Sequence, residues 1–175
     1  MKKIAFRGKL DSNTGKGNER KKQLRLVILT IVLALAAFPA AAGNRISIVD
    51  GDSIFIGERE VRLSGIDAPE YHQPCWNEEG KEYACGKKSR EVLVSLANDS
   101  LDCREVARDR YYRSVSVCTA DGEDINRKMV ELGWAVAYDR YSGDYVAAEK
   151  EARRDKRGIW AGKFMRPELY RVLNW

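Results

Sequence analysis

The pattern of apolar and polar positions predicts five strands. Five short segments either alternate apolar with polar positions or are rich in β-branched residues, and Gly51 and Gly57 separate the first three. The segments are residues 45–49, 53–56, 61–66, 101–107 and 113–119. Short runs of this kind, bounded by turn residues, are typical of strands. We therefore expect a three-strand meander followed by a hairpin.

Three further segments, at 87–97, 125–132 and 145–156, predict helices because their apolar residues recur every three or four positions. Asp124 is expected to cap the second of them, and residues 71–85 are expected to form an exposed loop. Together these elements predict an α+β, mainly β, fold: a five-stranded OB-fold Greek-key barrel with three α-helices, an architecture that commonly handles oligonucleotides.

The first 43 residues differ from the rest in composition. A basic lead-in with nine Lys and Arg residues precedes an apolar run of 17 residues, from Leu26 to Ala42. The run ends in three alanines, as the cleavage site of a secretory signal does. It is at the short limit for a membrane span. We predict that residues 1–43 are a cleaved signal peptide, with a retained membrane anchor as the alternative, and that residues 44–175 form one domain.

Removing the leader changes the charge of the protein. The whole chain has 31 Lys and Arg against 26 Asp and Glu, a formal net charge of +5. Residues 1–43 hold nine of the basic and two of the acidic residues, so residues 44–175 have 22 and 24, a net charge of −2. Attraction to nucleic acid must therefore come from a local site and not from the overall charge.

All four cysteines follow the leader. An even number in an exported chain favours disulfides. Cys103 and Cys118 are placed symmetrically about the expected hairpin turn, so they would face each other, while Cys75 and Cys85 would close a local loop. A four-cysteine zinc site is the competing interpretation, and the absence of any C-x-x-C pair disfavours it.

Candidate chemistry is concentrated between Asp50 and Glu70. Asp52, Asp67, Glu70 and Arg62 fall within these 21 residues. Carboxylates bind hard divalent cations, and arginine binds phosphate. Asp50-Gly51-Asp52 alone is more often a turn than a metal site, so the interpretation depends on the whole set. The set is the one that phosphodiester chemistry requires.

Four motifs occur in order and resemble the staphylococcal nuclease (thermonuclease) family. They are Asp50-Gly51-Asp52, Arg62 with Gly65-Ile66-Asp67-Ala68-Pro69-Glu70, Asp109-Arg110-Tyr111-Tyr112-Arg113, and Glu149-x-x-Ala152-Arg153. The resemblance covers about residues 45–161 and extends to the exported, disulfide-containing bacterial members of the family. It implies an OB-fold, calcium dependence, and hydrolysis of DNA and RNA that leaves 3′-phosphate ends. We therefore expect a calcium-dependent endonuclease on DNA and/or RNA with low sequence specificity.

The resemblance also implies a role for individual residues. For a calcium ion, it matches the carboxylates of Asp52 and Asp67 and the backbone carbonyl of Ala68. For catalysis, it matches Glu70 as the general base. For phosphate binding, it matches Arg62 and Arg113. Arg110 is the alternative to Arg113. Tyr138 and Tyr141 fall near aromatic residues of the substrate groove. His72 is expected to be exposed, and Glu149 and Arg153 are expected to form an ion pair one helical turn apart.

One departure from the family pattern falls beside a predicted site residue. Tyr112 stands where glycine is usual, and a positive φ there would strain a tyrosine and could redirect Arg113. Two other functions therefore stay open: a catalytically weak OB-fold module that binds nucleic acid, and a structural or interaction domain clipped by calcium. We expect a monomer without a stable protein partner, secreted or periplasmic, or tethered to the membrane outside the cytoplasm if the leader is retained.

Overall fold

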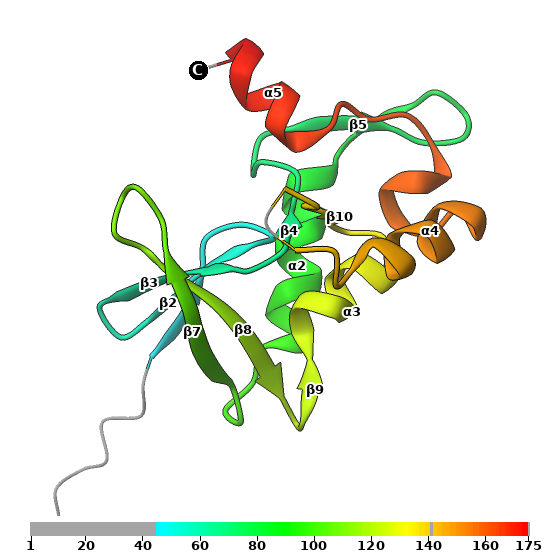
Figure 1. Ribbon diagram of the computed structural model, residues 1–175. Helices are drawn as coiled ribbons and strands as arrows, with labels where there is room; N and C mark the ends of the chain where they lie inside the picture. Colours follow the sequence, from blue (N-terminus) through cyan, green and yellow to red (C-terminus); the bar gives the residue numbers. More distant parts are fainter. Residues whose placement is uncertain (1–44, 141, 175) are drawn as a thin grey trace, which may run out of the picture. The chain divides into compact units, whose positions relative to one another are not determined.

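The five segments predicted as strands form five of the six strands of the main sheet (Figure 1). The five are β1 (Ile46–Ile48), β2 (Ser53–Ile56), β3 (Arg59–Leu63), β7 (Asp102–Arg108) and β8 (Ser114–Ala120), and the sixth is the two-residue strand β9 (Glu123–Asp124), which pairs with β8. The five lie in the order β1-β2-β3-β8-β7, and β3 with β8 is the one parallel pair in this order. Within the described residues β1 and β7 are not paired, so the barrel is partly open, as in OB-folds. The predicted fold class is confirmed.

The structure is a computed structural model that describes residues 45–140 and 142–174. The predicted leader, Tyr141 and Trp175 lie outside the described residues. The described residues form one compact unit. None of the helices in the described ranges combines the length and the apolar character needed to span a bilayer.

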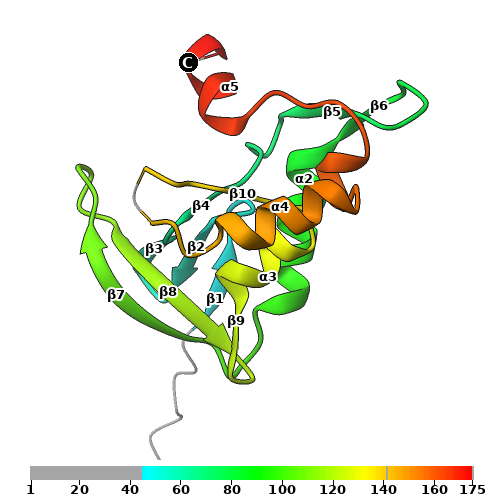
Figure 2. The same ribbon diagram turned by 45° about the vertical axis from the view of Figure 1, so that its right-hand side comes forward.

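The three predicted helices are present, and a fourth follows them. The α-helices within the described residues are α2 (Cys85–Leu96), α3 (Ile125–Glu131), α4 (Val146–Arg154) and α5 (Pro167–Asn174). Asp124 caps α3 as predicted, because its side chain accepts a hydrogen bond from the Arg127 backbone N–H at 2.9 Å. In both views α5 stands apart from α3 and α4 (Figures 1 and 2).

One apolar core joins the sheet to α2, α3 and α4. Ile54 and Val61 from the sheet, Leu93 from α2, Met129 from α3 and Ala148 from α4 all belong to it and are at most 5% exposed. Burial of such side chains stabilises each of these elements by about 1.5–3 kcal/mol per large residue. α5 contributes only its first residue, a proline, to the buried set.

The predicted strand at 61–66 is interrupted by a turn. Gly65 has a φ of +74°, a conformation that favours glycine, and a Cβ at this position would lie 2.9 Å from the Tyr145 ring. The chain therefore leaves β3 and forms β4 (Ile66–Asp67), which pairs with β10 (Val136–Ala137) in a separate ladder. The break moves Asp67 out of the main sheet and fixes it by a second set of backbone hydrogen bonds.

Both predicted disulfides are present, and no cysteine is free. Cys103 and Cys118 are direct partners in the β7–β8 register. Cys75 and Cys85 join the start of α2 to a small hairpin, β5 (Pro74–Trp76) and β6 (Glu82–Ala84), within the segment predicted to be a loop. The four-cysteine zinc alternative is therefore wrong.

The expected Glu149–Arg153 ion pair is also wrong. Glu149 is 8% exposed, accepts a hydrogen bond from the Ala137 backbone N–H at 2.7 Å, and pairs with Arg166 at 3.4 Å. Arg153 instead lies 4.9 Å above the Trp160 ring. A buried carboxylate requires hydrogen-bond donors, and Glu149 finds them on β10 and on Arg166, not on its own helix. This contact holds α4 against β10.

Candidate active site

A tight turn between β1 and β2 places Asp52. The Asp50 side chain accepts a hydrogen bond from the Asp52 backbone N–H at 3.0 Å, which forms an Asx turn. The turn packs so closely on α2 that a Cβ on Gly51 would collide with Ser89, so only glycine fits. Asp52 is 2% exposed and accepts hydrogen bonds from Ser53 Oγ and from the Ala68 backbone N–H. Its carboxylate is therefore fixed from two sides.

Arg62 joins Asp52 to Asp67. Arg62 lies opposite Ser53 in the β2–β3 register, and its Nη1 and Nη2 each lie 3.2 Å from an oxygen of Asp52. Its Nη2 also donates to Asp67 Oδ1 at 3.0 Å. Asp67 is only 1% exposed. The structure thus brings together three residues that the sequence predicts as site residues.

Arg171 of α5 adds a second guanidinium, which the sequence analysis did not identify. Its Nη2 lies 2.9 Å from Asp67 Oδ1, and its Nη1 donates to Glu70 Oε1 at 2.7 Å. The Glu70 backbone N–H is held by Gln73 Oε1 at 3.2 Å. Pro167 followed by Glu168 is a helix-start signal that could have revealed α5. The contact itself spans 101 residues of sequence, so no local pattern predicts it.

We name Asp50, Asp52, Asp67 and Glu70 the acidic cluster. Burial, with repulsion from Asp52, raises the pKa of Asp67 to about 6, although Arg171 and Arg62 oppose the change. Burial and Asp52 likewise raise the pKa of Asp50 to about 7. The two contacting guanidiniums balance only half of the four potential negative charges. The cluster therefore favours binding of a further cation.

Arg62 and Arg171, the two arginines that contact the acidic cluster, both have raised pKa values. Attraction by Asp52 is the main cause that raises the pKa of Arg62. Burial lowers the pKa of Arg171, but the attraction of Asp67 and the hydrogen bond to Glu70 outweigh burial and raise it overall. Both guanidiniums therefore carry a positive charge at neutral pH.

Arg113 contacts a different set of residues. Its Nε donates to Asp109 Oδ2 at 2.7 Å, and its Nη1 lies 3.5 Å from Glu60. No contact in the described residues joins it to the acidic cluster. Glu60 and Arg62 lie two residues apart on one face of β3, so Arg113 stands beside the strand that carries Arg62.

Tyr112 adopts the positive φ that the family pattern requires of glycine. Its φ is +64°, its backbone N–H donates to the Asp109 carbonyl at 3.0 Å, and its side chain is 80% exposed. A non-glycine residue in this conformation costs about 1–2 kcal/mol. The turn is nevertheless kept, because Asp109 Oδ1 also accepts from the backbone N–H groups of Tyr111 and Arg113.

The remaining predicted residues lie beside the cluster or away from it. The Tyr138 backbone N–H donates to the Gly65 carbonyl at 2.9 Å, next to the turn that leads into β4. Its role in a substrate groove stays a prediction, as does that of Tyr141. His72 is exposed as expected and packs edge-on against Tyr71.

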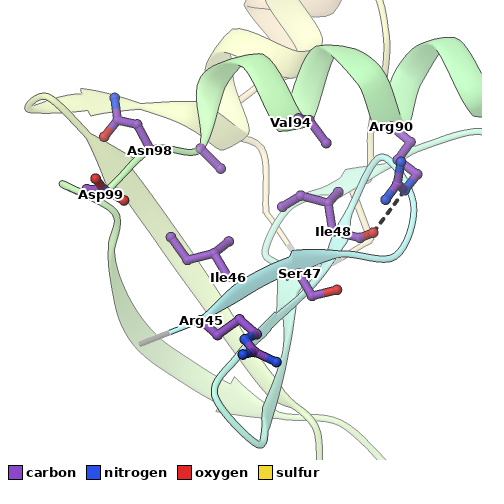
Figure 3. A pocket seen from close by; sticks show the side chains of 9 residues that line it. Arg45, Ile46, Ser47, Ile48, Arg90, Val94, Asn98 and Asp99 are labelled. Carbon is purple, nitrogen blue, oxygen red and sulfur yellow. Dashed lines mark hydrogen bonds between the residues drawn. The ribbon is translucent and has the colours of Figure 1, made fainter. Parts of the chain in front are cut away.

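A hollow of about 610 Å³ lies between β1 and α2 (Figure 3). Ile46, Val94, Arg45 and Arg90 are among its lining residues, and Arg90 Nε donates to the Ile48 carbonyl at 2.9 Å. It contains no residue of the acidic cluster. The chemistry of the side chains, and not the size of this hollow, identifies the candidate active site.

The donor set of the cluster suits calcium. The described residues contain no group of three or more His, Cys, Asp or Glu side chains that could hold a metal ion. A site here would therefore use Asp52, Asp67, a main-chain carbonyl and water. Calcium accepts such an all-oxygen set, and Arg62 Nη2 already lies within 3.2 Å of one oxygen of each of these two carboxylates.

The chain belongs to the family of staphylococcal nuclease homologues, because the family model matches residues 60–162. It is 42% identical over 118 residues to the succinoglycan biosynthesis protein ExoI of Rhizobium meliloti, covering 65% of this chain and 62% of that protein. It is 31% identical over 145 residues to an uncharacterized endonuclease of Escherichia coli O157:H7, covering 76% and 88%. A Haemophilus influenzae protein of the same description is 31% identical over 151 residues, covering 78% and 79%.

The raised pKa values predict how the calcium-free protein responds to pH. An acid whose pKa is higher in the folded state stabilises the fold below its unfolded pKa, and this stabilisation is lost as pH rises through about 6 for Asp67 and about 7 for Asp50. Asp50→Asn cannot ionise but keeps the oxygen that accepts from Asp52. We expect this variant to gain about 1–3 kcal/mol over wild type between about pH 4 and pH 8.

Urea unfolding in calcium-free buffers measures this difference. Asp155→Asn is the matched control, because Asp155 is exposed and its neighbour Arg154 lowers its pKa. The control should lose stability relative to wild type as pH rises, the opposite sign. A difference in unfolding free energy between Asp50→Asn and wild type that stays constant from about pH 4 to pH 8 would contradict the raised pKa of Asp50.

Proposed function

We propose that this chain is an exported, calcium-dependent endonuclease that hydrolyses phosphodiester bonds of DNA and/or RNA with low sequence specificity and leaves 3′-phosphate ends. The observation that carries the proposal is the meeting of Asp52, Asp67 and Arg62 in a member of the staphylococcal nuclease family. Two of the relatives named above are described as endonucleases. Paired carboxylates beside a guanidinium suit a divalent cation next to a phosphate.

Calcium would be held by Asp52, Asp67 and the main-chain carbonyl of Ala68. The hydrogen bond from the Ala68 N–H to Asp52 supports this ligand set, because it keeps the Ala68 backbone against the first carboxylate. When bound, calcium would supply the positive charge that stabilises negative charge on the phosphate oxygens. The remaining coordination positions would be filled by water and substrate.

Glu70 would act as the general base. Its carboxylate would accept a proton from a water molecule whose oxygen attacks the phosphorus. The bond from phosphorus to the 5′ oxygen would then break, and solvent would protonate the leaving oxygen. The products would be a 3′-phosphate and a 5′-hydroxyl. Glu70 is joined to the calcium ligand Asp67 through Arg171, which supports its assignment to the same site.

Arg62 and Arg113 would bind the reacting phosphate. Their planar guanidinium groups match two phosphate oxygens, a geometry that lysine cannot reproduce. Arg113 would have to exchange its 3.5 Å contact with Glu60 for the phosphate, and its bond to Asp109 would keep it oriented. Contacts of this kind do not read base edges, so low sequence specificity is expected.

The proposal also includes a cellular location, a substrate and an oligomeric state. The two disulfides support a secreted or periplasmic protein, because disulfides persist in oxidising compartments. A membrane-anchored form remains the alternative if the leader is retained. Nucleic acid is the expected substrate, and a monomer without a stable protein partner is the expected state.

We expect the wild-type protein to cleave plasmid and single-stranded DNA with calcium and to stop when calcium is chelated. Glu70→Gln should lower turnover by about 10²–10⁴-fold, because it removes the proton acceptor. Glu91→Gln, on the exposed face of α2, is the matched control and should cleave as wild type does.

The outcomes of this assay separate the three functions. Binding of oligonucleotide without cleavage would favour a catalytically weak OB-fold module. A calcium-dependent rise in melting temperature, with neither cleavage nor nucleic-acid binding, would favour a calcium-clipped structural domain. Undiminished turnover by Glu70→Gln would remove Glu70 from the role of base.

A second comparison decides between the two arginines of the β7–β8 turn. Arg113→Ala should lower turnover by about 10²–10³-fold, because it removes a positive charge from the transition state. Arg110→Ala should change turnover less than about threefold, because Arg110 lies over the exposed Tyr111 ring and has no tie to β3 among the described residues. Steady-state kinetics with both variants provides the measurement, and the reverse order of effects would reassign the phosphate-binding role to Arg110.

A further inference from the structure

Apolar packing explains only part of the position of α5. Pro167 is buried and Tyr170 is half-buried, but the large aliphatic residues of the helix, Leu169, Val172 and Leu173, are 50%, 71% and 62% exposed. The ion pairs of α5 in the described residues are those of Arg171 with the acidic cluster and of Glu168 with Arg140. Since the second pair is exposed, Arg171 makes the main contact that docks the helix.

A buried glutamine joins the backbone of Glu70 to the segment that leads into α5. Gln73 is fully buried, and its Nε2 donates to the Met165 carbonyl at 2.7 Å, two residues before α5 begins. Its Oε1 accepts from the Glu70 backbone N–H, and its own backbone N–H donates to the Glu70 carbonyl at 2.7 Å. The same side chain thus fixes the backbone of Glu70 and the start of the segment that carries Arg171.

The guanidinium of Arg171 bridges two carboxylates with separate nitrogens. Nη1 bonds Glu70 Oε1 at 2.7 Å, and Nη2 bonds Asp67 Oδ1 at 2.9 Å. Only arginine has a planar fork that can hold both at once. Within the described residues no hydrogen bond engages the second oxygen of Glu70, which leaves Oε2 able to accept a proton.

We propose that Arg171 is a positioning residue, which fixes the Glu70 carboxylate relative to Asp67 through the bidentate bridge. The inference rests on the proposed function, in which Glu70 is the base and Asp67 a calcium ligand. A glutamate side chain has three rotatable bonds, and this one is 21% exposed. Without Arg171 its carboxylate would sample several orientations, and loss of a fixed geometry lowers turnover by about 10²-fold.

The experiment compares Arg171→Ala and Arg171→Lys with the control Glu168→Gln, which breaks the other ion pair of α5. At saturating calcium we expect Arg171→Ala to lower kcat about 10–100-fold, with KM changed less than about threefold. Arg171→Lys should recover only part of the loss, because an ammonium group does not bridge both carboxylates. Glu168→Gln should retain wild-type kcat. The melting temperatures identify any variant that fails to fold.

A double-mutant cycle tests whether Arg171 acts through Glu70. In the Glu70→Gln background, Arg171→Ala should cause little further loss in single-turnover rate, whereas independent effects would multiply. A crystal structure of Arg171→Ala, without calcium, should show Glu70 in more than one rotamer. This readout does not depend on activity, and a single Glu70 rotamer identical to that of the wild type would overturn the proposal.

The possible failures are distinguishable. Absence of calcium-dependent cleavage by the wild type would overturn the proposed function and, with it, this inference. Normal cleavage by the wild type with unchanged kcat in Arg171→Ala would overturn the inference alone. Calorimetric titration of calcium gives a further check, because a higher kcat together with much tighter calcium binding in Arg171→Ala would make Arg171 a competitor of calcium and not a positioning residue.

Discussion

The candidate site depends on the compensation of buried carboxylates by guanidinium groups. Asp52 and Asp67 are almost completely buried, and two like charges in the interior cost several kcal/mol unless cations accompany them. The fold supplies Arg62 from β3 and Arg171 from α5. The turn at Gly65 completes the arrangement, because it moves Asp67 out of β3 and toward both arginines.

Local features of the sequence were sufficient to predict much of this structure. Alternation of apolar residues predicted the sheet, Asp124 predicted a helix start, and the spacing of Cys103 and Cys118 about a turn predicted their disulfide. Asp52, Arg62 and Asp67 could be predicted together because they lie within a short segment. Each of these signals depends on residues that are neighbours in sequence or across one hairpin.

Long-range contacts account for what the sequence did not reveal. Arg171 reaches Glu70 across 101 residues, and its helix is short and mostly exposed, so periodicity gives little indication of its partner. Glu149 looked like half of a helical ion pair, but burial forced it to take a backbone N–H of β10. Tyr112 violates the local preference for glycine, yet the hydrogen bonds of Asp109 hold the turn and outweigh the backbone strain.

Residues 44–175 have a net charge of −2, so under the proposed function the attraction of the acidic cluster for a phosphate would come from a bound cation and nearby arginines. Isothermal titration of calcium into the metal-free protein tests this claim most directly. The account predicts one calcium per chain for the wild type and loss of binding in Asp67→Asn, with both proteins folded. Absence of binding by the wild type, or equal binding by Asp67→Asn, would contradict it.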